Sequence, residues 1–363
     1  MPVPPITSQD RSRGVRRVQR VGAYGLLRSA DGAVLLVRAS RRSDFAGHWF
    51  LPGGGVRHGE DPQETVVREV AEETGIGLEV AGLRGVEADV LDIPHRGVRL
   101  HTVRLLYDLR PHPGSRWLDE AVGVAADVLA SALRPETDGT SDAAALVPEA
   151  ECARLPLMPF VSRALGLPET EPVAVPPARP VARAETSGED VAAAGDTGLV
   201  DGTHAEPPEA AAAAGEPAPV AAPRVQRSAA YALVTDQGRV LLTRLAHAEG
   251  VWTLPGGGIR FGEQPVDAAI REVHEEAGLP LTVGELIDVD SRHFTGHAPD
   301  GVLEDFHGIR VLYRGEVPAG SVPRVVEIGG TTDAVEWVRL DRLSGLPLTA
   351  LAAKALRHLP AQA

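Results

Sequence analysis

The chain has 363 residues, a formal net charge of -14 and 43% hydrophobic residues, but only 4% aromatic residues. Its length favours two domains, whose buried cores must be packed mainly by aliphatic side chains. The acidic net charge argues against a protein that generally binds nucleic acid or acidic membranes.

The chain opens with a basic segment. We predict that residues 1–17 form a disordered tail whose arginines are solvated rather than bound to phosphate. The basic cluster consists of Arg11, Arg13, Arg16, Arg17 and Arg20. The segment lacks the hydrophobic stretch of a secretory signal, and no apolar run approaches the roughly 20 residues of a membrane span. The single cysteine, Cys152, permits neither an intrachain disulfide nor a cysteine-based zinc site. We therefore expect a cytoplasmic protein.

Most of the remaining chain consists of an internal sequence repeat in two copies. The stretch "FLPGGGVRHGEDPQETVVREVAEETGI" at 50–76 returns as "TLPGGGIRFGEQPVDAAIREVHEEAGL" at 253–279 without a gap. Similarity extends on both sides of this stretch, for example "HTVRLLYDL" with "HGIRVLYRG" and "ETDGTSDAAALV" with "EIGGTTDAVEWV". We predict two complete copies of one domain, at residues 18–168 and 225–363.

A segment of different composition separates the copies. Residues 169–224 are rich in Pro, Ala, Gly and Glu and nearly lack aromatic and β-branched residues. Such a segment buries too little apolar surface to offset its ordering entropy, so we predict a disordered linker. The linker permits the domains to remain independent, to pair within the chain or to pair through a homodimer.

Each copy is expected to contain two strands, a glycine-rich loop, a helix, further strands and a terminal helix. "VGAYGLLR" and "AVLLVRA" around "SADG" indicate a hairpin. Pro62, the apolar spacing and Gly75 predict a helix over 62–74, and Pro265 and Gly278 frame its counterpart. Copy one alone contains "PHPGSRWLDEAVGVAADVLASALRP", which we interpret as an inserted helix, and copy two alone contains "SRHFTGHAPDGVLEDFHG", which we interpret as a polar loop over the active cleft.

The predicted helices carry like charges at adjacent positions. Glu69, Glu72 and Glu73 are spaced i, i+3 and i+4, so their carboxylates point the same way, and Glu272, Glu275 and Glu276 repeat the arrangement. At an effective dielectric of 20 each pair repels by about 3 kcal/mol, which partial burial makes prohibitive without a cation. A solvated face is the alternative. Carboxylate oxygens suit Mg²⁺ or Mn²⁺, and Mg²⁺ commonly shares its shell with phosphate oxygens, which indicates a diphosphate substrate.

The repeated pattern resembles the signature of the Nudix hydrolases. It reads Gly, five residues, Glu, seven residues, then Arg-Glu-apolar-any-Glu-Glu-any-Gly-apolar, from Gly54 to Ile76 and from Gly257 to Leu279. The resemblance implies two α/β/α sandwich domains with mixed sheets that hydrolyse nucleoside diphosphate derivatives. It implies metal ligands at Glu69, Glu72, Glu73, Glu272, Glu275 and Glu276, one of which can also act as general base. A later acidic residue often completes such a site; Glu136 and Glu327 are the candidates, with solvated loop glutamates as the alternative.

Other residues are expected to support this chemistry. Arg68 and Arg271 are interpreted as counter-charges that hold the glutamates, through Glu60 and Glu263, with an ordinary surface ion pair as the alternative. The glycines of "LPGGG" (Gly54, Gly55, Gly257 and Gly258) allow the backbone to approach a metal–phosphate site closely. For His101 and His307 we favour a structural role over substrate contact, and for Trp49 and Trp252 a core position over base stacking.

The substrate stays open. A nucleoside triphosphate, ADP-ribose, a dinucleoside polyphosphate or a nucleotide sugar would all satisfy the pattern. The chain contains no asparagine and no four-cysteine site, which disfavours reading of damaged guanine by an Asn amide and the zinc-bearing NADH-pyrophosphatase branch. The alternatives to two active sites are one catalytic domain beside a nucleotide-binding or regulatory one, and a sensor with no hydrolysis.

Overall fold

The computed structural model describes residues 15–112, 130, 133–134, 139–168, 222–248, 250–298, 301–326 and 329–359. Contacts divide the chain into two compact units, each holding one copy of the repeat. The predicted linker at 169–224 lies outside the described residues except for its last three, and so does nearly all of the tail and of the inserted helix. No described helix is long and apolar enough to cross a membrane.

The first domain is built on a four-stranded mixed sheet. Its strands lie in the order β4-β1-β6-β5, with β1 parallel to β6 and the other pairs antiparallel. A second, antiparallel sheet has the order β3-β2-β7. The strands are β1 (Arg16–Leu26), β2 (Ala33–Ala39), β3 (Trp49–Phe50), β4 (Gly53–Gly55), β5 (Leu78–Ile93), β6 (Val98–Pro111) and β7 (Ser141–Pro148). An antiparallel bridge between Arg28 and Val34 closes the predicted hairpin between β1 and β2.

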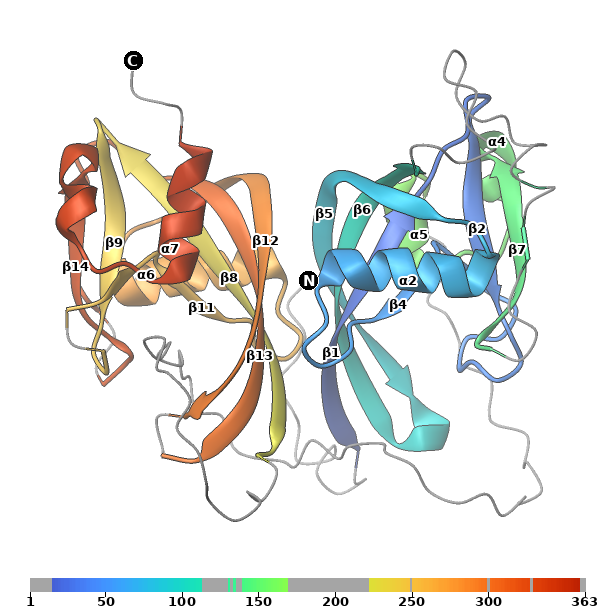
Figure 1. Cartoon of the computed structure of the whole chain (residues 1–363), viewed down its shortest axis with the longest axis horizontal. Helices are drawn as coiled ribbons and strands as arrows, with labels where there is room; N and C mark the ends of the chain where they lie inside the picture. The colour runs from blue at the N-terminus through green and yellow to red at the C-terminus, as the bar shows by residue number, and fades with distance from the viewer. Residues whose placement is uncertain are drawn as a thin grey trace, which may run out of the picture. The chain divides into compact units, whose positions relative to one another are not determined.

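Helices cover both faces of the larger sheet. The helix α2 (Pro62–Thr74) runs across the strands in Figure 1, and its Val66 meets Gly25 of β1 beside Leu109 of β6. On the other face, Phe160 of α5 (Pro159–Ala164) packs into the main apolar cluster with Tyr24 and Leu106. Alternation along β6 explains the division, because Leu106 and Leu109 point to opposite sides. The remaining helical segments are η1 (Pro94–Arg96) and α4 (Glu149–Cys152).

The second domain repeats this plan in one seven-stranded sheet. Its path is β10-β9-β8-β13-β12, with β11 on β8, β14 on β9, and β8 parallel to β13. The strands are β8 (Arg224–Asp236), β9 (Arg239–Leu245), β10 (Trp252–Thr253), β11 (Gly256–Gly258), β12 (Thr282–His297), β13 (Leu303–Glu316) and β14 (Thr332–Arg339). The helical segments are α6 (Pro265–Ala277), η2 (Leu340–Gly345), α7 (Ala350–Ala355) and η3 (Leu356–His358). The predicted mixed α/β architecture is confirmed in both copies.

The predicted helix boundaries are confirmed. At the start of α2 the Asp61 side chain accepts a hydrogen bond from the Gln63 amide, and Pro62 occupies the first turn. At its end Gly75 takes φ 72°, a left-handed conformation that favours glycine. The counterpart α6 ends in the same way at Gly278, with φ 65°. Each helix therefore begins and ends where local chemistry requires it.

Three local expectations need correction. The glycine-rich loop contains short strands, since Gly53–Gly55 pairs with β1 and Gly256–Gly258 pairs with β8. The stretch interpreted as a polar loop over the cleft is instead mostly the antiparallel end of the β12–β13 hairpin, paired from Ser291↔Ile309 to His297↔Leu303. Cross-strand pairing outweighed the polar composition there. Strand β1 also begins at Arg16, within the segment assigned to the tail, and β8 begins at Arg224, the last residue assigned to the linker.

Candidate active site

The three glutamates of α2 lie together but differ in exposure. Glu73 is buried, Glu69 is mostly buried, and the side chain of Glu72 is 44% exposed. In α6 the order is the same: Glu276 and Glu272 are buried, and the side chain of Glu275 is 28% exposed. We call each set of three the acidic ridge of its domain. The outer glutamate of each ridge is the one most accessible to a ligand.

The innermost glutamate ties the helix to two strands. In the first domain the Gly53 amide donates to Glu73 Oε2 at 2.9 Å, and the Ser141 hydroxyl donates to Oε1 at 2.6 Å. In the second domain the Gly256 amide and the Thr332 hydroxyl donate to Glu276 at 2.9 and 2.6 Å. A buried carboxylate needs such partners, because desolvation disfavours its charge. These contacts fix the ridge against the first residues of β4 and β7, or of β11 and β14.

The middle glutamate of each ridge explains why a glycine lies opposite it. A Cβ atom added to Gly54 would lie 2.5 Å from Glu69 Cδ, and one added to Gly257 would lie 2.7 Å from Glu272 Cδ. Side-chain carbons do not approach so closely, so the glycine makes room for the carboxylate. Burial raises the pKa of Glu69 above its ordinary value, and the hydrogen bond from Arg68 opposes this only in part.

Arg68 holds the first ridge through a fork of hydrogen bonds. Its Nε and Nη2 donate to Glu60 at 2.6 and 2.9 Å, while Nη1 donates to Glu69 at 2.6 Å and to Glu72 at 3.1 Å. The hydrogen bond from Arg68 lowers the pKa of Glu60 to about 2. The expected pairing of Arg68 with Glu60 is confirmed, and its bidentate, mostly buried geometry differs from that of an ordinary surface pair.

Arg271 forms the same fork in the second ridge. It donates to both oxygens of Glu263 at 2.8 and 2.9 Å, to Glu272 at 2.5 Å and to Glu275 at 3.0 Å. It makes one further bond, from Nη2 to the Gly258 carbonyl at 2.8 Å. Desolvation lowers the pKa of Arg271, but the hydrogen bond to Glu263 and the charge of Glu272 outweigh it and raise the pKa above its ordinary value.

The donor set fits a hard divalent cation. Each ridge presents carboxylate oxygens, the ligand type preferred by Mg²⁺ and Mn²⁺. Each domain sets four carboxylates against two arginines: in the first domain Arg68 contacts Glu60, Glu69 and Glu72, and Arg57 lies 3.6 Å from Glu72, while Glu73 is the fourth carboxylate. The buried side of the ridge therefore keeps an excess of negative charge that a cation would neutralise.

The remaining sequence candidates fall in different places. Glu136 and Glu327 lie outside the described residues. A Cβ added to Gly55 would meet no atom within 4 Å, so Gly55 does not support the ridge as Gly54 does. His101 and His307 are buried, and His307 lies 3.0 Å from both the Gln226 amide nitrogen and the Ser291 hydroxyl, in agreement with a structural role. Trp252 is buried and Trp49 packs against the core.

Sequence reasoning assigned no role to Ser141 and Thr332, the hydroxyl partners of the innermost glutamates. They occupy equivalent places in the repeated "GTSDA" and "GTTDA". The recurrence of a hydroxyl residue before an aspartate was a usable signal. Its meaning depends on a contact between residues 68 positions apart, which local patterns do not reveal.

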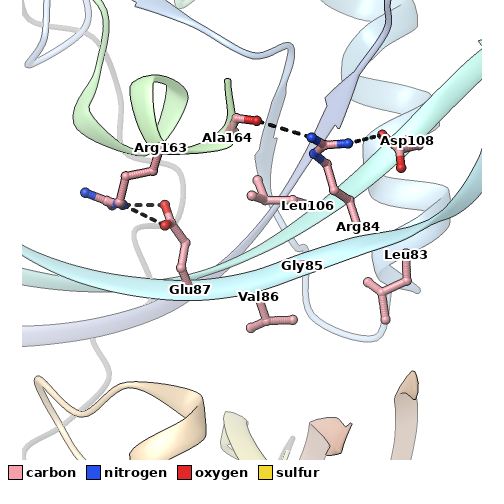
Figure 2. Close-up of a pocket in the computed structure, with 9 residues that line it drawn as sticks. All are labelled: Leu83, Arg84, Gly85, Val86, Glu87, Leu106, Asp108, Arg163 and Ala164. Carbon is pink, nitrogen blue, oxygen red and sulfur yellow. Dashed lines mark hydrogen bonds and ion pairs between the residues drawn. The ribbon is translucent and has the colours of Figure 1, made fainter. Parts of the chain in front are cut away.

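The first domain also contains a cleft of about 570 Å³ between β5, β6 and α5 (Figure 2). Arg84 bonds to Asp108 at 3.0 Å and to the Ala164 carbonyl at 3.3 Å along one side, and Arg163 bonds to Glu87 at 2.7 and 3.0 Å along the other. The cleft lies on the α5 face of the sheet, whereas α2 covers the opposite face. It is therefore separate from the acidic ridge.

The corresponding place in the second domain carries a charged side chain. Register places Asp288 opposite Leu312, as Gly85 lies opposite Leu106 in the first domain. The Asp288 carboxylate contacts Lys354 Nζ at 3.1 Å and His358 Nε2 at 3.2 Å. A glycine in one copy and an aspartate in the other thus change the surface beneath the terminal helix.

Comparison with known proteins agrees with this geometry. The NUDIX domain family matches residues 18–152 and 225–360, which together are well over half of the chain. The chain therefore belongs to the NUDIX family, as a Nudix pyrophosphohydrolase built from two tandem domains. Members of this family generally use divalent metal ions and act on small nucleotide substrates.

Individual relatives match one domain each. Nucleoside triphosphatase NudI of Escherichia coli is 28% identical over 142 residues, which cover 36% of this chain and 95% of that protein. An octanoyltransferase of Myxococcus xanthus is 36% identical over 125 residues, but this chain spans only 32% of its length. Among solved structures, the MutT NUDIX hydrolase from Burkholderia pseudomallei is 30% identical with a TM-score of 0.32, covering 38% of this chain and all of that one.

Proposed function

We propose that both domains hydrolyse the diphosphate linkage of nucleoside diphosphate derivatives, such as a nucleoside triphosphate or ADP-ribose, by attack of water at phosphorus. The observation that carries this proposal is the acidic ridge held by an internal arginine fork, present in full in both domains. The similarity of one domain to a nucleoside triphosphatase supports the substrate class.

The ridge would hold Mg²⁺ or Mn²⁺ through Glu69, Glu72 and Glu73 and through Glu272, Glu275 and Glu276. When bound, such an ion neutralises phosphate charge and activates water. Glu136 and Glu327 remain candidate further ligands. The division of labour follows from the contacts of the chain: the inner glutamates anchor the ridge, while Glu72 and Glu275 face outward. We assign to these outer carboxylates the position closest to substrate and attacking water.

Arg68 and Arg271 keep this arrangement in place. Each guanidinium bridges the middle and outer glutamates from one side, so their carboxylates stay apart and oriented in the absence of ligand. Gly54 and Gly257 complete the arrangement, because they let strands β4 and β11 pass directly over Glu69 and Glu272. Pre-orientation of this kind lowers the cost of assembling the site when substrate binds.

The test is a hydrolysis assay of the intact chain with Mg²⁺ and a panel of nucleoside triphosphates, ADP-ribose, dinucleoside polyphosphates and nucleotide sugars. Glu72→Gln and Glu275→Gln should each lower the activity of their own domain by at least about 100-fold, and the double substitution should abolish hydrolysis. Substitution of Glu79, a half-buried glutamate paired with Arg110 away from the ridge, serves as the control. Hydrolysis that survives the double substitution would contradict the proposed site.

The same assay separates the alternative of one catalytic and one regulatory domain. If Glu72→Gln alone removes all hydrolysis while Glu275→Gln leaves it intact, or the reverse, only one domain is catalytic. A nucleotide that raises the melting temperature without being hydrolysed would instead indicate a sensor.

A further inference from the structure

A second arginine recurs beside each ridge and approaches the outer glutamate. Arg57 follows β4 and Arg260 follows β11, within "GGGVRHGE" and "GGGIRFGE". Arg57 Nη2 lies 3.6 Å from Glu72 Oε1, and Arg260 Nη2 lies 3.3 Å from Glu275 Oε2. Both arginines therefore approach the outer glutamate from the segment that precedes the helix, and not from the helix itself.

The backbone of each arginine is fixed while its side chain extends outward. The Arg57 amide donates to Glu60 Oε2 at 3.1 Å, and the Arg260 amide donates to Glu263 Oε2 at 2.8 Å. These acceptors are held in turn by Arg68 and Arg271. The side chains of Arg57 and Arg260 are 63% and 42% exposed. Each guanidinium is thus tethered at a set place beside the ridge and remains open to solvent.

A purely structural role explains these arginines poorly. Their contacts to the outer glutamates are long, and exposed ion pairs of this kind contribute little to stability. Arg68 and Arg271, by contrast, make short, bidentate bonds within the domain. Each ridge thus already has one arginine that holds the glutamates through short bonds, and the second arginine contacts the outer glutamate at longer range.

Charge suggests what the second arginine does. When a cation takes the outer glutamate, the contact between that glutamate and the nearby guanidinium weakens, and the substrate adds negative charge from its phosphates. A guanidinium has the planar fork that matches phosphate oxygens. We infer that Arg57 and Arg260 are phosphate-binding residues of their two sites: each pairs with the outer glutamate before ligand binding and with a phosphate oxygen of the metal-bound substrate afterwards. This inference rests on the proposed function.

The inference predicts opposite effects on nucleotide binding and on metal binding. With Arg57→Gln and Arg260→Gln combined, the Kd of the non-hydrolysable analogue α,β-methylene adenosine diphosphate, measured by calorimetry with saturating Mg²⁺, should rise about ten-fold or more. The Kd of Mg²⁺ measured without nucleotide should stay equal or fall, because a cation that competes for the glutamates has been removed. Arg57→Lys combined with Arg260→Lys should lie between, since lysine keeps the charge but not the fork.

Arg110 and Arg339 supply matched controls. Both side chains are 64% exposed and ion-paired, with Glu79 and Asp341, away from the ridges. Their combined substitution by Gln removes the same charge and should leave both Kd values unchanged. An unchanged analogue Kd in the Arg57/Arg260 variant, or Mg²⁺ binding that weakens in parallel with it, would overturn the inference. Failure of the wild-type chain to bind Mg²⁺ and the analogue would instead overturn the proposed function itself.

Discussion

The two domains share the main hydrogen bonds of the glutamates and differ beneath the terminal helix. Glu73 and Glu276 accept the same pair of bonds, and the forks of Arg68 and Arg271 match within a few tenths of an ångström. On the opposite face of the sheet, one domain has a cleft beside Gly85 and the other has Asp288 bonded to Lys354 and His358. The charge chemistry is therefore common to both copies, and the surface on the other side has diverged.

The second ridge is also the more enclosed of the two. Arg271 makes an additional bond to the Gly258 carbonyl, and Glu272 is more buried than Glu69. Its outer glutamate is less exposed, and its second arginine lies closer. A more enclosed ridge leaves less water around its charges, which strengthens their interaction with a cation. We therefore expect the two domains to bind the same ion with unequal affinity.

The largest expected effect concerns the glycine that faces the middle glutamate. Gly54→Ala should displace the Glu69 carboxylate, because the added carbon would lie 2.5 Å from Cδ. Mg²⁺ affinity and hydrolysis by the first domain should fall by about ten- to 100-fold. Gly55→Ala is the matched control, since its Cβ meets no atom within 4 Å. Equal losses in both variants, measured by calorimetry and turnover, would show that the strand rather than the Glu69 contact is responsible.

A smaller effect is expected at the hydroxyl partners of the innermost glutamates. Ser141→Ala removes a 2.6 Å bond to a buried carboxylate and should lower the local opening free energy around α2 by about 1–3 kcal/mol. Hydrogen exchange of α2 peptides in the intact chain measures this change. Thr332→Ser keeps the hydroxyl in the second domain and should leave α6 peptides nearly unchanged, whereas Thr332→Ala should reproduce the loss. Protection that is insensitive to either alanine would mean that the hydroxyls do not support the ridge.

The smallest expected effect is a pH dependence of the stability that the ion pair of Glu60 with Arg68 contributes. Because the folded-state pKa of Glu60 is about 2 against an ordinary value of 4.5, its ion pair stabilises the fold above pH 4.5 and loses that contribution as the pH falls through this range towards 2. Urea denaturation should show the stability difference between the wild type and Glu60→Gln shrinking by about 1–2 kcal/mol from pH 7 to pH 3. Glu79→Gln is the comparison, and a difference independent of pH would contradict the depressed pKa.

Much of the site could be predicted because it is encoded locally. Pro62, Asp61 and Gly75 set the ends of α2, and helical spacing alone places Glu69, Glu72 and Glu73 on one side. The same pattern occurs in both copies of the repeat, so the residues of the second ridge could be predicted in the same way. The pairing of Arg68 with Glu60 was also accessible, since the two are only eight positions apart, across the start of α2.

What sequence reasoning missed depends on strands that meet from distant parts of the chain. The polar stretch at 291–308 became a hairpin because β12 and β13 pair through their backbones, which side-chain composition does not report. The cleft beside Gly85 likewise arises only where β5, β6 and α5 come together.

The sequence by itself determined the two domains, the helices and the residues of each ridge, because helix caps and helical periodicity act over a few neighbouring positions. Only the tertiary structure decided which glutamate is buried, which glycine lies against it and which hydroxyl reaches it. The physical reason is that the burial of a charge depends on what the sheet brings beside it, and Ser141 comes to Glu73 only through the pairing of β7 with β2.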